Sequence, residues 1–337
     1  MESIITPQPH RLVSSGSEHP VQSSTPALAG TSDGGSSPPS HHLSTPEEIS
    51  SFVDQMDTFI FDCDGVLWLG NDTIKGAPEF LHELVAKGKR IIYVTNNSSK
   101  SRKTYVGKFK KLGFPAEPDN IFGSAYAAAY YLKNMLNFPA DKKVYVVGMQ
   151  GIVDELAEMG IQAVGAGDDN APLQETEFEN GTLGPDESIG AVLLGFDSQI
   201  NYRKYAKAFT YLTANKGKVH FLATNEDRTY PISGSIYPGT GSLLAALIHS
   251  VNRRPDAVLG KPSQNMMNTI LERFHLDPAR TCMVGDRLDT DIAFGKLGKL
   301  HTLLVMTGVT SVEERDAKKG PVTAEYWIES VGHLRQR

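Results

Sequence analysis

The sequence has little cysteine, no long hydrophobic run and no excess of positive charge, and each of these absences excludes a class of protein. Only Cys63 and Cys282 occur in 337 residues, which is too few for a disulfide framework and fits a reducing compartment. No segment approaches the roughly 20 apolar residues of a transmembrane helix. The net charge is −6, so nothing favours nucleic acid or an anionic membrane as a partner. We therefore expect a soluble, cytoplasmic protein.

Residues 1–45 lack aromatic side chains, and 25 of them are Ser, Thr, Pro or Gly. Such a composition cannot bury enough apolar surface to offset the entropy cost of ordering the chain, so we expect a disordered tail over residues 1–45. The tail has neither the apolar stretch of a secretory signal nor the Arg-rich character of a transit peptide. We interpret its His41–His42 pair as solvated, because no cysteine or second spaced pair accompanies it.

After residue 57, short β-branched and aromatic runs alternate with helical stretches. The expected strands cover residues 58–63, 90–95, 143–147, 190–196, 219–224, 257–259, 281–284 and 301–306. The expected helices cover residues 77–87, 100–112, 125–136, 152–159, 202–215, 241–251, 264–274 and 290–297. This alternation predicts an α/β fold with a doubly wound parallel sheet covered on both faces. The polar segment 168–188 interrupts the alternation, and we expect a long surface excursion there.

In doubly wound sheets, ligands bind beyond the carboxyl ends of the strands, so the polar residues at strand ends are the candidates for a site. The first strand ends in Asp62-Cys63-Asp64-Gly65. Because strand side chains alternate, Asp62 and Asp64 lie on the same face. Two carboxylates this close require a cation between them, or a division of labour between an ionised nucleophile and a protonated acid. An ordinary Asp- and Gly-rich turn is the alternative interpretation.

Two further strand ends carry groups suited to an anion. The second strand ends in Thr95-Asn96-Asn97 just before a helix, where a hydroxyl, amides and main-chain N–H groups form an anion cradle, or only a helix cap. Lys261 follows an apolar run and lies between Gly260 and Pro262. A lysine held in this way is better suited to bind an anion than one on a free surface.

A fourth strand end supplies more carboxylates. The segment 281–291 places Asp286 directly after an apolar run and Asp291 five residues later, at the start of the next helix. Hard cations such as Mg²⁺ prefer carboxylate oxygens, with water and substrate phosphate completing the shell. Asp62 and Asp286 together offer this set of ligands.

These four segments, in this order, resemble the four motifs of the haloacid dehalogenase superfamily of phosphohydrolases, over about residues 55–337. Finer features resemble the branch that holds p-nitrophenyl phosphatases, phosphoglycolate phosphatases and the pyridoxal phosphate phosphatase chronophin. These features are Asp-Cys-Asp-Gly-Val-Leu-Trp at 62–68, Gly-Ala-Pro at 76–78, Asn-Asn-Ser at 96–98, Ala-Thr-Asn at 223–225, Pro-Gly-Thr-Gly at 238–241, Gly-Lys-Pro at 260–262 and Gly-Asp-Arg-Leu-Asp-Thr-Asp at 285–291.

The resemblance implies a role for each acidic residue. Asp62 would be the nucleophile that forms an aspartyl-phosphate, and Asp64 would protonate the leaving alkoxide and then deprotonate water. Mg²⁺ would be held by Asp62, Asp286 and the main-chain carbonyl of Asp64. Asp291 would orient the metal site and Lys261 without being a metal ligand itself. Asp289 is expected on the surface.

The resemblance also implies which residues bind the phosphate. Thr95 and Lys261 would hold phosphoryl oxygens, with Asn96 or Asn97 nearby. The family's specificity loop matches residues 223–231, so Arg228 and Tyr230 are the candidates that face the substrate. A solvated loop is the alternative there.

The spacing between the motifs implies an inserted domain. We expect core segments at residues 46–141 and 247–337, interrupted by an α/β cap domain at 142–246. The strand at 143–147 could belong to either unit. Caps of this type often dimerise in the family, so we expect a homodimer through the cap.

The expected activity is Mg²⁺-dependent hydrolysis of a small phosphorylated metabolite, 2-phosphoglycolate first, with p-nitrophenyl phosphate as a surrogate. One alternative is a pyridoxal phosphate or phosphoprotein phosphatase of the chronophin type. Tyr230 stands where that protein has a histidine, which weighs against it. Another alternative is a non-catalytic binding protein that reuses the fold, and the intact motif residues weigh against that.

Overall fold

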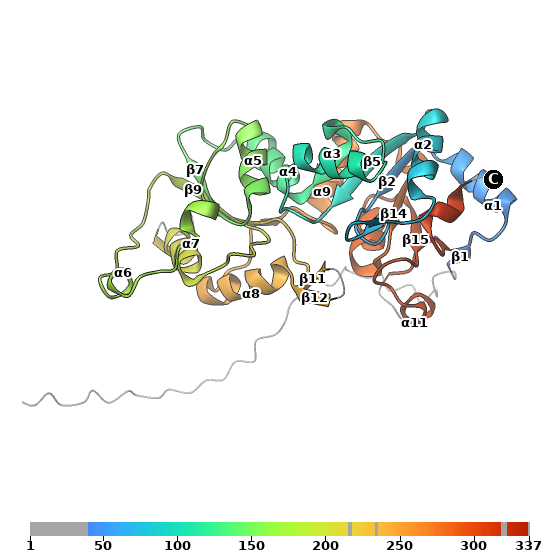
Figure 1. The fold of residues 1–337 in the computed structure, drawn as a ribbon. Coiled ribbons are helices and arrows are strands. Elements are labelled where there is room, and N and C mark those ends of the chain that lie inside the picture. Colours follow the sequence, from blue (N-terminus) through green and yellow to red (C-terminus); the bar gives the residue numbers. More distant parts are fainter. Residues whose placement is uncertain (1–39, 215–217, 233–234, 318–321, 336–337) are drawn as a thin grey trace, which may run out of the picture. The chain divides into compact units, whose positions relative to one another are not determined.

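A parallel sheet of seven strands carries the predicted catalytic segments (Figure 1). The structure is a computed structural model that describes residues 40–214, 218–232, 235–317 and 322–335, and all of these lie in one compact unit. Of the tail predicted over residues 1–45, residues 1–39 lie outside the described ranges. Within the described ranges, every helix is too short or too polar to span a bilayer.

The strand order of this sheet is β1-β16-β15-β14-β2-β5-β6, and every neighbouring pair is parallel. The strands are β1 (His41–His42), β2 (Thr58–Phe61), β5 (Arg90–Thr95), β6 (Ile121–Gly123), β14 (Thr281–Gly285), β15 (His301–Val305) and β16 (Tyr326–Ile328). The chain passes from β2 to β5 and β6 on one side, and later to β14 on the other. The order therefore reverses between β2 and β14, and the predicted doubly wound α/β fold is confirmed.

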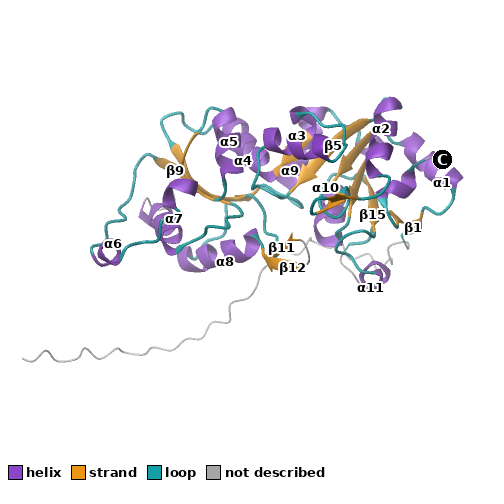
Figure 2. Cartoon of the chain, viewed as in Figure 1, coloured by secondary structure: helices purple, strands orange, loops and turns teal. Residues whose placement is uncertain are grey.

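Helices cover both faces of this sheet (Figure 2). Side chains alternate along β2, so Phe59 and Phe61 pack on one face and Ile60 packs on the other. The first face is covered by α1 (Pro46–Gln55), α2 (Ala77–Ala86) and α3 (Arg102–Lys111). The second is covered by α4 (Ser124–Tyr130), α9 (Gln264–Phe274) and α10 (Ala293–Leu297). Burial on both faces explains why the strands are continuous apolar runs.

A second parallel sheet lies between β6 and α9 in the sequence, with the order β13-β10-β9-β7-β8. Its strands are β7 (Lys143–Val147), β8 (Gln162–Gly165), β9 (Ile189–Leu194), β10 (His220–Ala223) and β13 (Ala257–Val258). Helices α7 (Tyr202–Ala214) and α8 (Thr240–Val251) pack on one face, and α5 (Gln150–Glu158) contributes to the core on the other. The undecided strand at 143–147 thus belongs to this sheet.

The sheet membership changes the predicted end of the insert. The boundary at residue 246 falls inside α8, whose Leu244 and Leu247 pack in the core of the second sheet. β13 then pairs with β10, so this unit continues to Val258. Composition could not locate the end, because an apolar helix packs equally well on either sheet.

The elements outside the two sheets are short. They are the hairpins β3 (Trp68–Leu69) with β4 (Asp72–Thr73) and β11 (Thr229–Ile232) with β12 (Ser235–Pro238), together with α6 (Glu175–Glu179) and α11 (Val312–Asp316). α6 lies in the predicted excursion 168–188. Strands β6, β8 and β16 were not predicted, because runs of three or four residues carry too little periodicity. Helix α1 was also not predicted.

Residues 40–45 do not belong to a disordered tail, contrary to the prediction. His41 and His42 form β1, which pairs with β16, and Thr45 caps α1 with Glu48 in a capping box. The ring of His42 stacks on Trp327 with centroids 3.8 Å apart. His41 is exposed, as predicted, whereas His42 is partly covered by this stack. Backbone pairing with β16 orders residues that the composition placed in the tail.

Candidate active site

The predicted site residues converge where the strand order reverses. Asp62 directly follows β2, Thr95 ends β5 and Asp286 directly follows β14. Since β2 lies between β14 and β5, the three side chains emerge at the same carboxyl edge of the sheet. The N–H of Asp62 continues the sheet ladder to the carbonyl of Val284 at 2.9 Å, which holds the backbone at the strand end.

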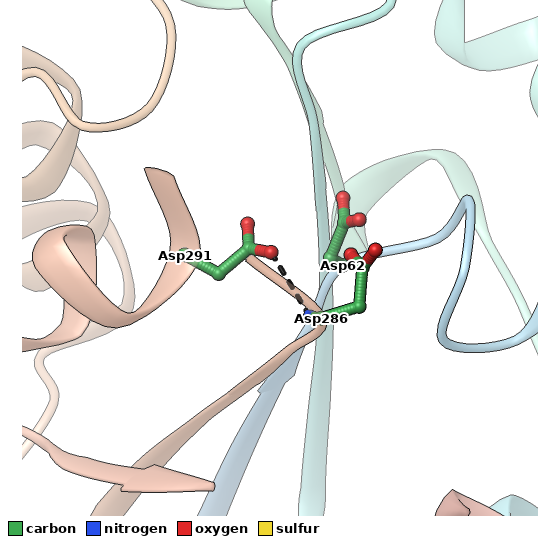
Figure 3. Close-up of side chains that lie close together, drawn as sticks. All are labelled: Asp62, Asp286 and Asp291. Carbon is green, nitrogen blue, oxygen red and sulfur yellow. Dashed lines mark hydrogen bonds between the residues drawn. The ribbon is translucent and has the colours of Figure 1, made fainter. Parts of the chain in front are cut away.

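Three carboxylates meet at this edge (Figure 3). Asp62, Asp286 and Asp291 each offer an oxygen within 4.8 Å of the others. Asp291 comes from a π-helical turn, Leu288–Ile292, and its Oδ2 accepts from the N–H groups of Asp286 and Arg287 at 3.1 Å each. Asp286 and Asp291 are each only 1 % exposed. The cluster thus lies almost entirely out of solvent.

Lys261 inserts its ammonium into this cluster. Its Nζ lies 2.6 Å from Oδ1 of Asp62 and 2.7 Å from Oδ1 of Asp291, and the side chain is buried. Burial alone would lower the pKa of Lys261, but the charges of Asp291 and Asp62 outweigh burial and raise it. The lysine is therefore charged, and it bridges two buried acids that would otherwise repel each other.

One lysine does not neutralise three carboxylates. Burial raises the pKa of Asp62 well above its usual range, although the Lys261 ammonium opposes the rise. Burial, followed by the charge of Asp291, raises the pKa of Asp286 to about 7. Both shifts have the same physical cause, which is negative charge held away from water with too few positive partners. The protein without a bound cation therefore stores unfavourable electrostatic energy here.

The donor set fits a hard divalent cation. Oδ2 of Asp286 accepts from the N–H of Val309 at 2.7 Å, whereas its buried Oδ1 has no hydrogen-bond partner among the described residues. A buried acceptor without a partner is costly, and a cation would provide the partner. The loop at Gly65 also packs tightly here, because a Cβ on Gly65 would lie 2.6 Å from Oδ2 of Asp286. Carboxylate oxygens of this kind are typical ligands of Mg²⁺ or Ca²⁺.

The side chain of Asp64 lies apart from the carboxylate cluster. Its Oδ1 accepts from Nε1 of Trp68 at 2.8 Å, and Nζ of Lys108 lies 3.9 Å from the same oxygen. The Lys108 ammonium also lies 4.1 Å from the centroid of the Trp68 ring. Both contacts fall on Oδ1, which leaves Oδ2 as the oxygen available to a bound ligand.

The predicted phosphate-binding residues divide into two kinds. The hydroxyl of Thr95 accepts from the N–H of Asn97 at 3.1 Å, and Asn97 Nδ2 donates to the hydroxyl of Tyr230 at 3.0 Å. Thr95, Asn96 and Asn97 all line the cavity beside the carboxylates. Asn96 differs from the other two, because its amide is engaged with the main chain of Lys261 and with Asp227. Its amide is therefore occupied by protein groups and does not offer a free donor to phosphate.

The cavity at this edge has a volume of about 100 Å³. Tyr230 lines it and stacks on Phe196, with ring centroids 4.5 Å apart. Arg228 was predicted to face the substrate, but its side chain is exposed and does not line this cavity; it borders a neighbouring hollow with Glu226 and Asp256. The main chain of Arg228 is held in place, because its carbonyl accepts hydrogen bonds from the N–H of Gly239 and the hydroxyl of Ser242.

Sequence reasoning missed several lining residues. They are Phe196, Asn225, Asp227, Thr229, Gly239, Thr240, Arg287, Thr290 and Val309. Phe196 and Val309 each follow a parallel strand, but they are apolar, and the rule that identified Asp62 selects only polar residues at strand ends. Asp227 and Arg287 lay inside segments already quoted for the resemblance, but only the tertiary contacts distinguish them from their neighbours.

Comparison with known proteins agrees with this geometry. Residues 59–162 match the family described as haloacid dehalogenase-like hydrolase, and residues 258–334 match a second description of the same kind, HAD-like hydrolase. The chain is 43 % identical over 295 residues to a 4-nitrophenylphosphatase of Schizosaccharomyces pombe, an alignment that covers 87 % of this chain and 98 % of that protein. The chain belongs to the haloacid dehalogenase-like hydrolases.

Other members of this hydrolase family carry different names. The chain is 43 % identical to phosphoglycolate phosphatase 1A of Arabidopsis thaliana, over 85 % of this chain and 78 % of that protein. It is 40 % identical to glycerol-3-phosphate phosphatase of Gallus gallus, over 86 % of this chain and 94 % of the other.

Solved structures of this hydrolase family have the same fold. A 4-nitrophenylphosphatase from Thermotoga maritima superimposes with a TM-score of 0.70 and 29 % identity, over 85 % of this chain and 99 % of that one. A glycerol phosphate phosphatase from Mycobacterium tuberculosis, solved in complex with magnesium, gives a TM-score of 0.70 and 27 % identity, over 85 % and 78 % of the two chains.

Proposed function

We propose that this chain is a Mg²⁺-dependent phosphomonoesterase acting on a small phosphorylated metabolite, with 2-phosphoglycolate as the first candidate. One observation carries the proposal: the ammonium of a buried lysine lies 2.6 Å from Asp62, beside two further buried carboxylates, and all four residues line a small cavity. Phosphoryl transfer requires this combination of a positioned nucleophile and concentrated positive charge. Lys261 alone supplies too little positive charge, and a bound cation would supply the rest.

Asp62 acts as the nucleophile in this proposal. An oxygen of its carboxylate forms a bond to phosphorus while the ester P–O bond breaks, so the phosphoryl group is transferred to Asp62 as an aspartyl-phosphate. Asp62, Asp286 and the main-chain carbonyl of Asp64 would hold Mg²⁺, which would neutralise part of the charge on the phosphoryl oxygens. Asp291 orients Lys261 and the main chain at Asp286 and Arg287, as its hydrogen bonds indicate.

Asp64 moves the proton in both halves of the reaction. Its Oδ2 donates a proton to the leaving alkoxide, and the same carboxylate then removes a proton from the water that attacks the aspartyl-phosphate. That attack breaks the bond between Asp62 and phosphorus and releases inorganic phosphate. Because Trp68 and Lys108 both contact Oδ1, the orientation of the carboxyl group is defined before substrate binds.

Thr95, Asn97 and Lys261 bind the remaining phosphoryl oxygens in this proposal. Thr95 and Lys261 are buried at the cavity edge, where water competes little for their hydrogen bonds. Asn97 donates to the hydroxyl of Tyr230, and a substrate oxygen would compete with that hydroxyl.

The substrate is proposed from the named relatives. The 43 % identity to a phosphoglycolate phosphatase favours 2-phosphoglycolate. Glycerol 3-phosphate is the second candidate, since relatives of that name share 40 % identity or slightly less. p-Nitrophenyl phosphate is the surrogate.

The test compares kcat/KM of purified protein with Mg²⁺ on 2-phosphoglycolate, glycerol 3-phosphate, pyridoxal 5′-phosphate and p-nitrophenyl phosphate. We expect 2-phosphoglycolate to give the highest value, with activity lost in EDTA and in Asp62→Asn. Asp289→Asn, which changes an exposed carboxylate near the site, is the matched control and should stay active. Folded protein with no turnover of any ester would refute the function, and a preference for another ester would refute only the substrate.

We also propose that the protein is a cytoplasmic homodimer that associates through the inserted α/β unit, as the family resemblance implies. Light scattering at micromolar concentration should give twice the mass of the chain. A monomer under those conditions would refute the dimer without affecting the proposed chemistry.

A further inference from the structure

Asn96 joins three segments that are far apart in the sequence. It follows β5, and its side chain reaches Lys261 after β13 and Asp227 in the loop before the β11–β12 hairpin. We propose that Asn96 is a positioning residue whose amide couples the insert's loop to Lys261 through Asp227, and that it does not bind phosphate. This inference rests on the proposed function, because it concerns the residues that act on the phosphoryl group.

The contact with Lys261 fixes that residue's main chain at two points. The N–H of Lys261 donates to Oδ1 of Asn96 at 2.7 Å, and Nδ2 of Asn96 donates to the carbonyl of Lys261 at 2.9 Å. The approach requires glycine at the preceding position, since a Cβ on Gly260 would lie 2.7 Å from Oδ1 of Asn96. A peptide held in this way directs the lysine side chain toward Asp62.

The contact with Asp227 links the same amide to the insert. Nδ2 of Asn96 lies 3.1 Å from Oδ2 and 3.2 Å from Oδ1 of Asp227. Burial raises the pKa of Asp227, and the hydrogen bond from Asn96 opposes the rise. Asp227 and Tyr230 are three residues apart, and Tyr230 accepts from Asn97. Two consecutive asparagines therefore hold two points of one loop over the cavity.

The contact between Asn96 and Asp227 can be tested by exchanging the amide and the carboxylate between the two positions. Asn96→Asp places a carboxylate against Asp227 and removes the donor, so we expect kcat/KM for 2-phosphoglycolate to fall roughly 100-fold. Asp227→Asn keeps an acceptor for Nδ2, and the value should stay within about threefold of wild type. In the double variant Asn96→Asp/Asp227→Asn the donor and acceptor of this contact are exchanged, whereas the bond to the Lys261 carbonyl stays lost. The recovery of kcat/KM should therefore be partial, at least about tenfold over Asn96→Asp.

A phosphate-binding role for Asn96 predicts a different result. A carboxylate at position 96 would then repel the substrate whatever stands at 227, so the double variant would be as weak as Asn96→Asp alone. That result would overturn the inference, as would a loss in Asp227→Asn equal to that in Asn96→Asp. Asn134→Asp, an exposed change of the same type, is the control and should match wild type.

Asp227→Ala tests the same contact without altering the strand end. It removes the loop's anchor while the two hydrogen bonds between Asn96 and Lys261 remain, so KM should rise about tenfold with kcat within about threefold of wild type. A fall in kcat with unchanged KM would contradict the coupling. Thermal unfolding of each variant reports folding, and inactivity of the wild type on every ester would refute the proposed function instead.

Discussion

The ammonium of Lys261 lies 2.6 Å from the carboxylate of Asp62, although the two residues are 199 positions apart in the sequence. Both side chains are buried, and both contact or adjoin further carboxylates. The pair joins the end of a core strand to the segment that follows the inserted sheet. The ion pair between Lys261 and Asp62 therefore depends on how the two sheets are packed within the compact unit.

Replacing the lysine should destabilise the fold as well as stop the reaction. Lys261→Met leaves Asp62, Asp286 and Asp291 without a cationic side chain, and loss of one partner from a buried ion pair costs about 3–5 kcal/mol of unfolding free energy. Denaturant unfolding in EDTA measures this loss, and added Mg²⁺ should recover part of it. Lys103→Met removes an exposed ion pair and should cost about 1 kcal/mol or less. Equal losses in the two variants would contradict the assignment.

The shifted pKa of Asp286 predicts how stability of the metal-free protein depends on pH. Its folded pKa of about 7 lies above the ordinary value, so the folded state binds the proton more tightly than the unfolded state. The stabilising contribution is present below the ordinary pKa and is lost as pH rises through about 7.

Asp286→Asn removes this titration. In EDTA at pH 8 we expect the variant to have a higher melting temperature than wild type, with the difference shrinking toward pH 4. Mg²⁺ should raise the melting temperature of wild type and have little effect on the variant. A variant that is less stable than wild type in EDTA at pH 8, or equally stabilised by Mg²⁺, would contradict the picture.

Replacing Trp68 should lower kcat/KM mainly for substrates whose leaving group must be protonated. Trp68→Phe removes the hydrogen bond to Oδ1 of Asp64, so kcat/KM for 2-phosphoglycolate should fall about tenfold. The value for p-nitrophenyl phosphate should change less than about threefold, because p-nitrophenolate is a weak base that departs without protonation. The value of kcat/KM reports the transfer of the phosphoryl group to Asp62 and not the later hydrolysis.

Trp327→Phe, which alters the stack with His42, is the control for this variant. Equal losses of kcat/KM on both esters in Trp68→Phe would mean a general structural defect.

Tyr230 and Arg228 should differ in their effect on substrate binding. Tyr230 stacks on Phe196 inside the cavity, whereas the Arg228 side chain lies outside it. We expect Tyr230→Ala to raise KM for 2-phosphoglycolate about fivefold and Arg228→Ala to leave it within about twofold. Steady-state kinetics of both variants at saturating Mg²⁺ decides this. A larger effect at Arg228 would favour the original sequence-based interpretation.

The sequence by itself determined the fold class and the main candidates for chemistry. Alternation of apolar strands with helical stretches requires a parallel sheet, and parallel strands bring their carboxyl ends to one edge. Asp62, Thr95 and Asp286 were identified in this way, because their positions relative to strands are local properties. The motif spacing also indicated that a second unit is inserted between them.

Only the tertiary structure decided what each side chain contacts. It showed that Asn96 is occupied by Lys261 and Asp227, that Arg228 is exposed, and that Asp64 is held by Trp68 and Lys108. It also ended the insert at β13 and ordered the chain at His41. These outcomes depend on long-range packing and on competition among nearby polar groups for the same partners, which no periodicity in the sequence records.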